Sequence, residues 1–188
     1  MQRQFLSTSE EATLALGEKL GRSLPAGTVM TLDGDLGTGK TTLVRGLGAG
    51  LGIEGSISSP TYTLMQAHEG GRLPLFHFDA WMEGREKALL ADGADEFLTS
   101  DGIAVVEWGS RVADWLPIPR LEVTLGHRTP EERTVQIRVI GSDGASADPL
   151  LAQLEGLLTA LSAPGAISGL VATDLGASSE PPGVPGVE

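Results

Sequence analysis

The chain contains a match to the phosphate-binding P-loop pattern G-x-x-x-x-G-K-[ST], which runs Gly34-Asp35-Leu36-Gly37-Thr38-Gly39-Lys40-Thr41. Its glycines permit positive φ angles and a close approach of backbone amides to an anion. In this pattern the lysine reaches the β- and γ-phosphates, and the final hydroxyl is placed for Mg²⁺. An apolar strand-like segment, 28–32, precedes it, and a helical segment, 42–51, follows it. We therefore expect the loop to bind a nucleotide through Asp35, Leu36, Gly37, Thr38, Gly39, Lys40, Thr41 and Thr42.

Composition restricts the possible partners and compartments of the chain. Its 188 residues allow one domain with a tail, and its net charge is −12 with only three lysines. Such an acidic surface repels phosphodiester backbones, so direct, tight nucleic-acid binding is not expected. There is no cysteine, no apolar run long enough for a membrane span and no apolar signal-peptide core near the N-terminus. These features predict a cytoplasmic protein that does not enter a membrane.

Hydrophobic patterning predicts an α/β domain over residues 1–140. Residues 1–8 are interpreted as a lead-in, and Thr8 with Glu11 has the form of a capping box that starts a helix ending near Gly21. A second, acidic helix is expected over 82–98. Strands are expected at 28–32, 62–68, 73–78, 103–106, 121–125 and 134–140.

The expected strands combine into a P-loop NTPase-like, three-layer fold with a mixed, largely parallel central sheet. The segments 62–68 and 73–78 form a hairpin, and 121–125 with 134–140 suggest an edge hairpin. Beyond Gly141 we expect a C-terminal extension, 141–162, with an amphipathic helix over 148–161. Residues 163–188 are rich in Gly, Ala, Ser and Pro and are predicted to be disordered.

Acidic residues end two of the expected strands. Glu107 follows the apolar run 103–106, which resembles a Walker B pattern whose carboxylate meets Mg²⁺ or its water. Asp79 ends the strand 73–78 and is interpreted as a Mg²⁺-binding or water-positioning residue. Alternation places His77 on the same face as Asp79; a metal pair is one interpretation, and a structural histidine is the preferred one.

Further candidates surround these acids. In the loop 55–61, the hydroxyls of Ser59 or Thr61 would meet the γ-phosphate or Mg²⁺ if the loop acts as a switch, whereas a simple linker is the alternative. Trp108 is either a core residue or packs near the phosphates. Glu10 lies at a helix start that is placed near the base or serves only capping and solvation. Arg133 either reaches a phosphate or base or is solvated.

Four motifs together resemble the TsaE family, also called YjeE, in order and at the family's spacing over about residues 5–140. They are the P-loop, Ser59-Pro60-Thr61-Tyr62-Thr63-Leu64, His77-Phe78-Asp79 and Val106-Glu107-Trp108. The resemblance implies a small bacterial Mg²⁺-dependent ATPase needed to form N6-threonylcarbamoyladenosine at position 37 of tRNAs that read codons beginning with A. It also implies that the protein binds the TsaD–TsaB heterodimer and resets it by hydrolysing ATP to ADP, without transferring the threonylcarbamoyl group itself.

By the same resemblance, Lys40 and Thr41 hold phosphate and Mg²⁺, Glu107 completes the Mg²⁺ site and Asp79 assists hydrolysis. Thr61 belongs to the switch-like loop, and Trp108 lies beside the active site. The chain departs from the family where Leu-Tyr-Arg-Leu usually follows His-Phe-Asp, because Ala80-Trp81-Met82-Glu83 stands there. Ser110 stands where the family often has an acid. Any role of the missing tyrosine and arginine does not carry over.

Other P-loop functions remain as alternatives. A GTPase is disfavoured, since reading guanine through Asn-Lys-x-Asp requires an asparagine and the chain has none. A small-molecule kinase would need an arginine-rich lid, and residues 82–100 offer only Arg85 and Lys87. A nucleotide-gated binding module, in which hydrolysis is incidental, is the third possibility.

Overall fold

The computed structural model of the chain describes residues 1–81, 94–141 and 148–173. Its sheet has eight strands in the order β3-β4-β5-β2-β6-β7-β1-β8. The strands are β1 (Gln2–Ser7), β2 (Thr28–Asp33), β3 (Met65–His68), β4 (Leu75–Asp79), β5 (Ile103–Glu107), β6 (Arg120–His127), β7 (Arg133–Ile140) and β8 (Leu170–Thr173). The helices are α1 (Glu10–Ser23), α2 (Lys40–Leu51), α4 (Ala94–Leu98), α5 (Pro149–Leu161) and the 3₁₀ helix η1 (Gly109–Trp115).

The sheet is mixed, which confirms the predicted fold class, but it is parallel only in its centre: among the described strands, three pairings are parallel and four are antiparallel. Strands β4, β5, β2 and β6 pair in parallel, whereas β3, β7, β1 and β8 join in antiparallel fashion at the two sides. In the parallel part, Asp79 pairs with Glu107, and Glu107 pairs with Leu32. The carboxyl ends of β4, β5 and β2 therefore meet at one edge, next to the loop that leads into α2.

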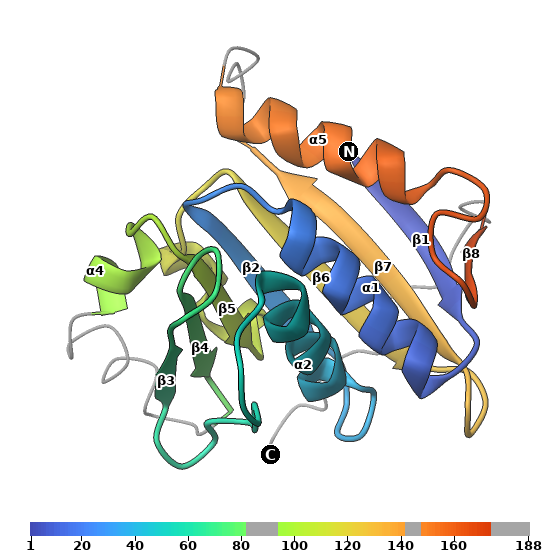
Figure 1. Cartoon of the computed structure of the whole chain (residues 1–188), viewed down its shortest axis with the longest axis horizontal. Coiled ribbons are helices and arrows are strands. Elements are labelled where there is room, and N and C mark those ends of the chain that lie inside the picture. The colour runs from blue at the N-terminus through green and yellow to red at the C-terminus, as the bar shows by residue number, and fades with distance from the viewer. Residues whose placement is uncertain (82–93, 142–147, 174–188) are drawn as a thin grey trace, which may run out of the picture.

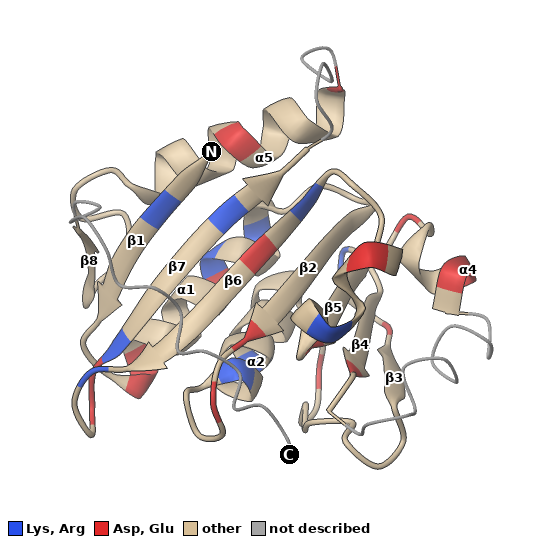
Figure 2. Ribbon diagram, turned by 180° about the vertical axis from the view of Figure 1, so that it is seen from behind, with Lys and Arg blue, Asp and Glu red and all other residues tan. Residues whose placement is uncertain are grey.

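Helices cover the two faces of the sheet unequally. On one face α1, α2 and α5 bury a core cluster in which Leu16, Leu43 and Leu158 pack with Ile137 of the sheet (Figure 1). On the other face η1 and α4 cover the β4 and β5 side, where Phe78 lies in a second cluster. Figure 2 shows β6, β7 and β1 on that second face with no described helix over them. On this second face, the described helices thus cover only the part of the sheet formed by β4 and β5.

Glycines allow α1 and α2 to pack with their backbones in contact. A Cβ atom added at Gly17 would lie 2.2 Å from the Leu43 carbonyl oxygen, and one at Gly46 would lie 2.1 Å from the Leu14 carbonyl oxygen. Gly21 and Gly50 face equally close backbone atoms of the opposite helix. We call these four residues the glycine seam. The helix backbones are in direct contact there, so any larger side chain must push them apart.

The N-terminal residues differ from the expected lead-in and capping box. Residues 2–7 form β1, which lies inside the sheet between β7 and β8. The N-cap of α1 is Ser9 and not Thr8, because the Ser9 hydroxyl accepts from the backbone amide of Ala12 at 3.2 Å. Thr8 instead donates its amide and hydroxyl to the carbonyl of Gly169, each at 3.0 Å.

Two hairpins also differ in detail from expectation. β3 begins only at Met65, because Leu64 adopts a φ of 65° and donates its amide to Pro60 in a turn. The β6–β7 hairpin is not at an edge, since β1 and β8 extend the sheet beyond it. Of the helix expected over 82–98, only α4 falls within the described residues.

The C-terminal extension joins the same core. α5 matches the expected amphipathic helix, with the Asp148 carboxylate accepting from the amides of Leu150 and Leu151. Over residues 163–173 the structure differs from the predicted disorder, because Ile167 is buried and β8 pairs with β1. An unpaired strand edge offers backbone hydrogen bonds to almost any sequence, which composition does not reveal. The rest of the expected tail lies outside the described residues.

Within the described part of the chain, no helix combines the length and apolar character needed to cross a membrane.

The glycine seam predicts opposite effects for two glycine-to-alanine substitutions. Gly46→Ala is expected to lower the free energy of unfolding by about 1–3 kcal/mol, because its methyl group meets the Leu14 carbonyl. Gly156→Ala in α5 is the matched control, since nothing lies within 4 Å of its added Cβ, and should raise that free energy by about 0.5–1 kcal/mol. Urea unfolding measures both. Equal shifts in the same direction would contradict the close contact.

The ordered residues after α5 predict where the chain can be shortened. Ending it after Ala163 removes buried Ile167 and β8 and should destabilise the fold by about 2 kcal/mol or more. Ending it after Thr173 keeps every one of these contacts and is the control. Thermal unfolding of the two truncated proteins compares them, and equal melting temperatures would show that β8 does not stabilise β1.

Candidate active site

The P-loop connects β2 to α2 and forms a tight turn that depends on its glycines. Gly34, Gly37 and Gly39 have φ angles of 135°, 78° and 101°, in the region that favours glycine. A Cβ at Gly34 would lie 2.1 Å from the Leu125 carbonyl oxygen, so the loop also needs glycine there for space. Inside the loop, the Thr38 hydroxyl donates to the Asp35 carbonyl at 2.9 Å. This is the glycine-rich turn that the sequence pattern predicted.

Lys40 begins α2 and lies buried, with 5% of its surface exposed. Its Nζ donates to the carbonyl oxygens of Gly34 at 2.6 Å and Asp35 at 3.0 Å. Burial lowers the pKa of Lys40, while the nearby carboxylates, Glu107 foremost, act in the opposite direction. The ammonium group is therefore held at the loop by neutral carbonyls and faces acids across the site.

Glu107 ends β5 beneath the start of α2 and is 3% exposed. Its Oε1 accepts from the Thr41 hydroxyl at 3.1 Å and lies 3.0 Å from Nε2 of His77. Residues 41 and 107 are far apart in the chain, and the parallel pairing of β2 with β5 brings them together. The structure thus joins the two residues that were predicted to bind Mg²⁺.

Asp79 ends β4, directly beside Glu107, and is also buried. Its Oδ2 accepts from the hydroxyls of Ser59 at 3.0 Å and Thr61 at 2.7 Å, and its Oδ1 accepts from the Trp81 amide at 2.8 Å. The carboxylate therefore anchors the 55–61 loop. The sequence named all of these residues except Trp81 as candidates for the site, but not their shared hydrogen bonds.

An aromatic pair stands next to the P-loop lysine. Trp108 has a φ of 59°, unusual for a bulky residue, and its amide donates to Leu32 at 2.7 Å. This backbone conformation places its ring centroid 4.1 Å from Nζ of Lys40, in a cation–π contact. The Trp81 ring packs against it at 4.5 Å, and the Arg111 guanidinium lies 5.2 Å from the Trp81 ring centroid.

These groups line a pocket of about 330 Å³. Its wall combines P-loop residues with the acids and the tryptophans: Leu36, Lys40, Thr41, Thr61, Glu107 and Trp108. The lysine and the acids Asp79 and Glu107 also line it, and all three are buried. A chain of phosphates laid along the P-loop amides would face both acids from this side.

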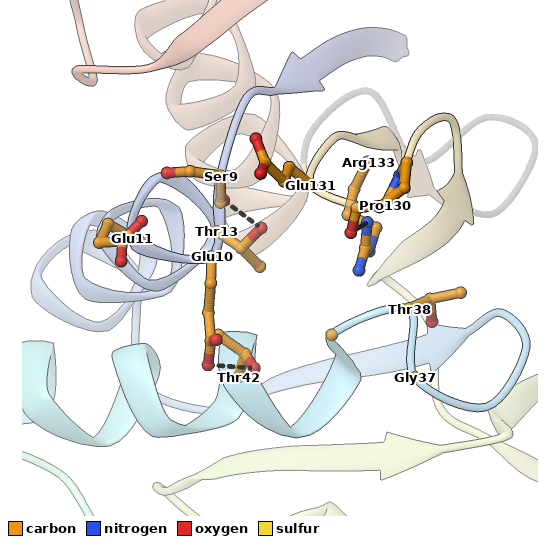
Figure 3. A pocket seen from close by; sticks show the side chains of 11 residues that line it. Ser9, Glu10, Glu11, Thr13, Gly37, Thr38, Thr42, Pro130, Glu131 and Arg133 are labelled. Atoms are coloured by element: carbon orange, nitrogen blue, oxygen red, sulfur yellow. Dashed lines mark hydrogen bonds between the residues drawn. The ribbon is translucent and has the colours of Figure 1, made fainter.

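A second pocket, of about 460 Å³, adjoins the P-loop on the α1 side. Figure 3 shows Glu10 and Thr13 of α1 on one side of it, Arg133 and Pro130 on the other, and Thr38 of the P-loop below. The carboxylate of Glu10 accepts from Arg45 at 2.8 Å, and Arg133 donates to carbonyls of its own loop, including that of Pro130 at 3.1 Å. Both pockets share Gly37, Gly39 and Thr42.

The donor set suits a hard cation bound jointly with phosphate. Among the described residues, no group of three or more His, Asp or Glu side chains is placed to hold a metal by itself. The Thr41 hydroxyl and Glu107 carboxylate are adjacent oxygen donors, and Mg²⁺ is commonly held by one or two such ligands together with water and phosphates. The residues present therefore fit Mg²⁺ bound with a nucleotide.

The predicted site residues are assembled around the P-loop, with Glu10 and Arg133 in the second pocket and the others in the first or within the loop itself. Sequence reasoning missed Asp33, which ends β2 and accepts from the Ser110 hydroxyl at 2.7 Å. It also missed Trp81 and Arg111 as neighbours of Trp108. An acid directly after a strand was a readable signal for Asp33. Nothing in the sequence indicated the placement of Arg111.

Comparison with known proteins agrees with this arrangement. The family model described as "Threonylcarbamoyl adenosine biosynthesis protein TsaE" matches residues 7–135. Proteins described as tRNA threonylcarbamoyladenosine biosynthesis protein TsaE include one from Bacillus subtilis, 34% identical over 142 residues, which cover 75% of this chain and 88% of that one. The one from Streptomyces coelicolor is 38% identical over 146 residues, covering 71% and 94%.

A solved structure is similar over most of its length. The crystal structure of Bacillus subtilis YdiB superposes with a TM-score of 0.69 and 28% sequence identity, covering 85% of this chain and 95% of that one. Together with the family model and the curated relatives, this shows that the chain belongs to the TsaE family, whose members take part in tRNA threonylcarbamoyladenosine biosynthesis.

Proposed function

We propose that this chain is a Mg²⁺-dependent ATPase of tRNA threonylcarbamoyladenosine biosynthesis, hydrolysing ATP to ADP and phosphate without itself transferring the threonylcarbamoyl group. One observation carries the proposal. The Thr41 hydroxyl lies 3.1 Å from the Glu107 carboxylate, and Asp79 stands on the next strand beside Glu107. A P-loop, a metal-binding pair and a further acid at one sheet edge are the parts that nucleoside triphosphate hydrolysis needs.

We assign some of these residues to nucleotide binding and others to catalysis. Backbone amides of the P-loop and the N-terminus of α2 bind the phosphates, and Lys40 stabilises the charge that develops at the γ-phosphate. Thr41 and Glu107 would hold Mg²⁺, which when bound neutralises charge on the β- and γ-phosphate oxygens. Asp79, with its partners Ser59 and Thr61, orients the attacking water.

The second pocket would take the nucleoside. It continues from the P-loop between α1 and the β6–β7 loop, and its volume of about 460 Å³ is sufficient for a base and ribose. Glu10 is placed there by the start of α1, and Arg133 by the start of β7. These two residues are therefore proposed to contact the nucleoside part of ATP or ADP.

A protein partner would complete the reaction. Among the described arginines near the site, Arg45 pairs with Glu10, Arg133 donates to its own loop, and Arg111 lies behind the tryptophans. Each of these guanidinium groups is already engaged by protein atoms, so hydrolysis by the isolated chain should be slow. The TsaD–TsaB heterodimer, in the cytoplasm, is the proposed partner.

Phosphate release from ATP, measured with and without TsaD and TsaB, tests the proposal. Slow release alone and faster release with the partners are expected. A binding module that merely responds to nucleotide would still support tRNA modification when Asp79→Asn leaves ATP bound but not hydrolysed, whereas an ATPase should stall. Modification by this variant at the parent rate would favour the module.

Lys40→Ala is expected to reduce ATP hydrolysis at least about 100-fold, because it removes the charge stabilisation at the γ-phosphate. Lys19→Ala is the control, since Lys19 is an exposed residue of α1. Phosphate release under saturating ATP compares the two variants. Hydrolysis at the parent rate by Lys40→Ala would show that the P-loop is not the catalytic site.

The two acids should lose different properties when each is converted to its amide. Asp79→Asn is expected to reduce turnover about 100-fold, because the Asp79 carboxylate is proposed to orient the attacking water. It should leave ATP affinity nearly unchanged. Glu107→Gln should raise the Mg²⁺ concentration for half-maximal activity about tenfold. Titrations of ATP and Mg²⁺ measure both. If Asp79→Asn weakens ATP binding while Glu107→Gln keeps the Mg²⁺ dependence, the two roles are reversed.

A further inference from the structure

His77 contacts the proposed metal site from inside the core. It lies on β4 two residues before Asp79, and its side chain is 0% exposed. The strand alternation puts it on the sheet face that packs against α2, together with Asp79 and Glu107. The preferred interpretation of the sequence made it a structural residue with no part in the site.

The two side-chain hydrogen bonds of Glu107 among the described residues converge on one carboxylate oxygen. His77 Nε2 lies 3.0 Å from Oε1, and the Thr41 hydroxyl donates to that same Oε1 at 3.1 Å. Among the described residues no donor contacts Oε2. Two partners on Oε1 restrict the orientation of the carboxylate and leave Oε2 as the oxygen with free acceptor capacity.

The geometry also determines which ring nitrogen carries the proton. His77 Nδ1 is buried and has no hydrogen-bond partner among the described residues. A proton on Nδ1 would be an unsatisfied buried donor, and a bare Nε2 would then face a carboxylate oxygen. The favourable arrangement is therefore an Nε2–H group that donates to Glu107.

We propose that His77 is a positioning residue that locks Glu107 through Oε1 and so directs Oε2 toward the Mg²⁺ of a bound nucleotide. The inference rests on the proposed function, because it assigns Glu107 to the metal. Hydrogen-bonded partners of a ligating carboxylate typically contribute tenfold or more to metal affinity. Loss of this donor should therefore weaken Mg²⁺ binding without changing how the P-loop binds phosphate.

Two amide variants separate the donor from the bulk of the side chain. In His77→Gln the amide nitrogen can occupy the position of Nε2, whereas in His77→Asn it reaches only the position of Nδ1. Both are uncharged amides, so the reach of the donor is the main difference between them. His68→Asn is the control, since His68 lies on the neighbouring strand β3 and its Nε2 has no partner among the described residues.

Calorimetry with the non-hydrolysable ATP analogue AMP-PNP, in MgCl₂ and in EDTA, gives the Mg²⁺-dependent gain in affinity for each protein. We expect His77→Asn to reduce this gain about tenfold or more. His77→Gln and His68→Asn should retain it, and affinity in EDTA should be the same for all. A full gain in folded His77→Asn overturns the inference, as does an equal loss in both His77 variants.

Two further measurements test the metal site and the histidine tautomer separately. Glu107→Gln examined in the same way separates the hypotheses: if it also keeps the full gain, the proposed metal site itself is wrong, and not only the role of His77. Long-range ¹⁵N NMR spectra of the unmodified protein report the histidine tautomer without any substitution. An Nδ1–H tautomer at His77 would overturn the inference even if His77→Asn failed to fold.

Discussion

The parallel pairing of β4, β5 and β2 is the constraint on which the site depends. Its register sets Asp79 beside Glu107 and Glu107 beside Leu32, one residue before the end of β2. Because all three strands run in the same direction, their last residues reach one edge, where the P-loop begins. A shift of one residue in either pairing would turn an acid to the opposite face of the sheet, away from α2.

Burial raises the energetic importance of every polar contact at this edge. Lys40, Asp79 and Glu107 are all nearly enclosed, and charged groups in such surroundings need specific partners. Each has them: loop carbonyls for the lysine, two hydroxyls and an amide for Asp79, and Thr41 with His77 for Glu107. The unusual backbone of Trp108 belongs to the same arrangement, because it closes the ring over the lysine.

Local signals in the sequence were sufficient where one segment determines the outcome. The P-loop, the acids that end β4 and β5, and helix α5 were all readable from spacing and periodicity. Features set by distant segments were not. β1 forms a strand because it pairs with β7, and β8 forms one because it pairs with β1. His77 joins the site because β4 lies next to β5. Ser9, and not Thr8, caps α1 because Gly169 takes up the hydrogen bonds of Thr8.

The glycine seam has a mechanical consequence for the proposed nucleotide site. α1 carries Glu10 to the pocket proposed for the nucleoside, and α2 begins at Lys40, which is proposed to contact the phosphates. Because their backbones are in direct contact, a hinge motion of one helix away from the other would break that contact. Outside these two helices, the walls of the pockets include Ser59 and Thr61 of one loop and Pro130 and Glu131 of another. Under the proposed function, a protein bound over these two loops would cover a wall of each pocket and thereby control the timing of nucleotide exchange.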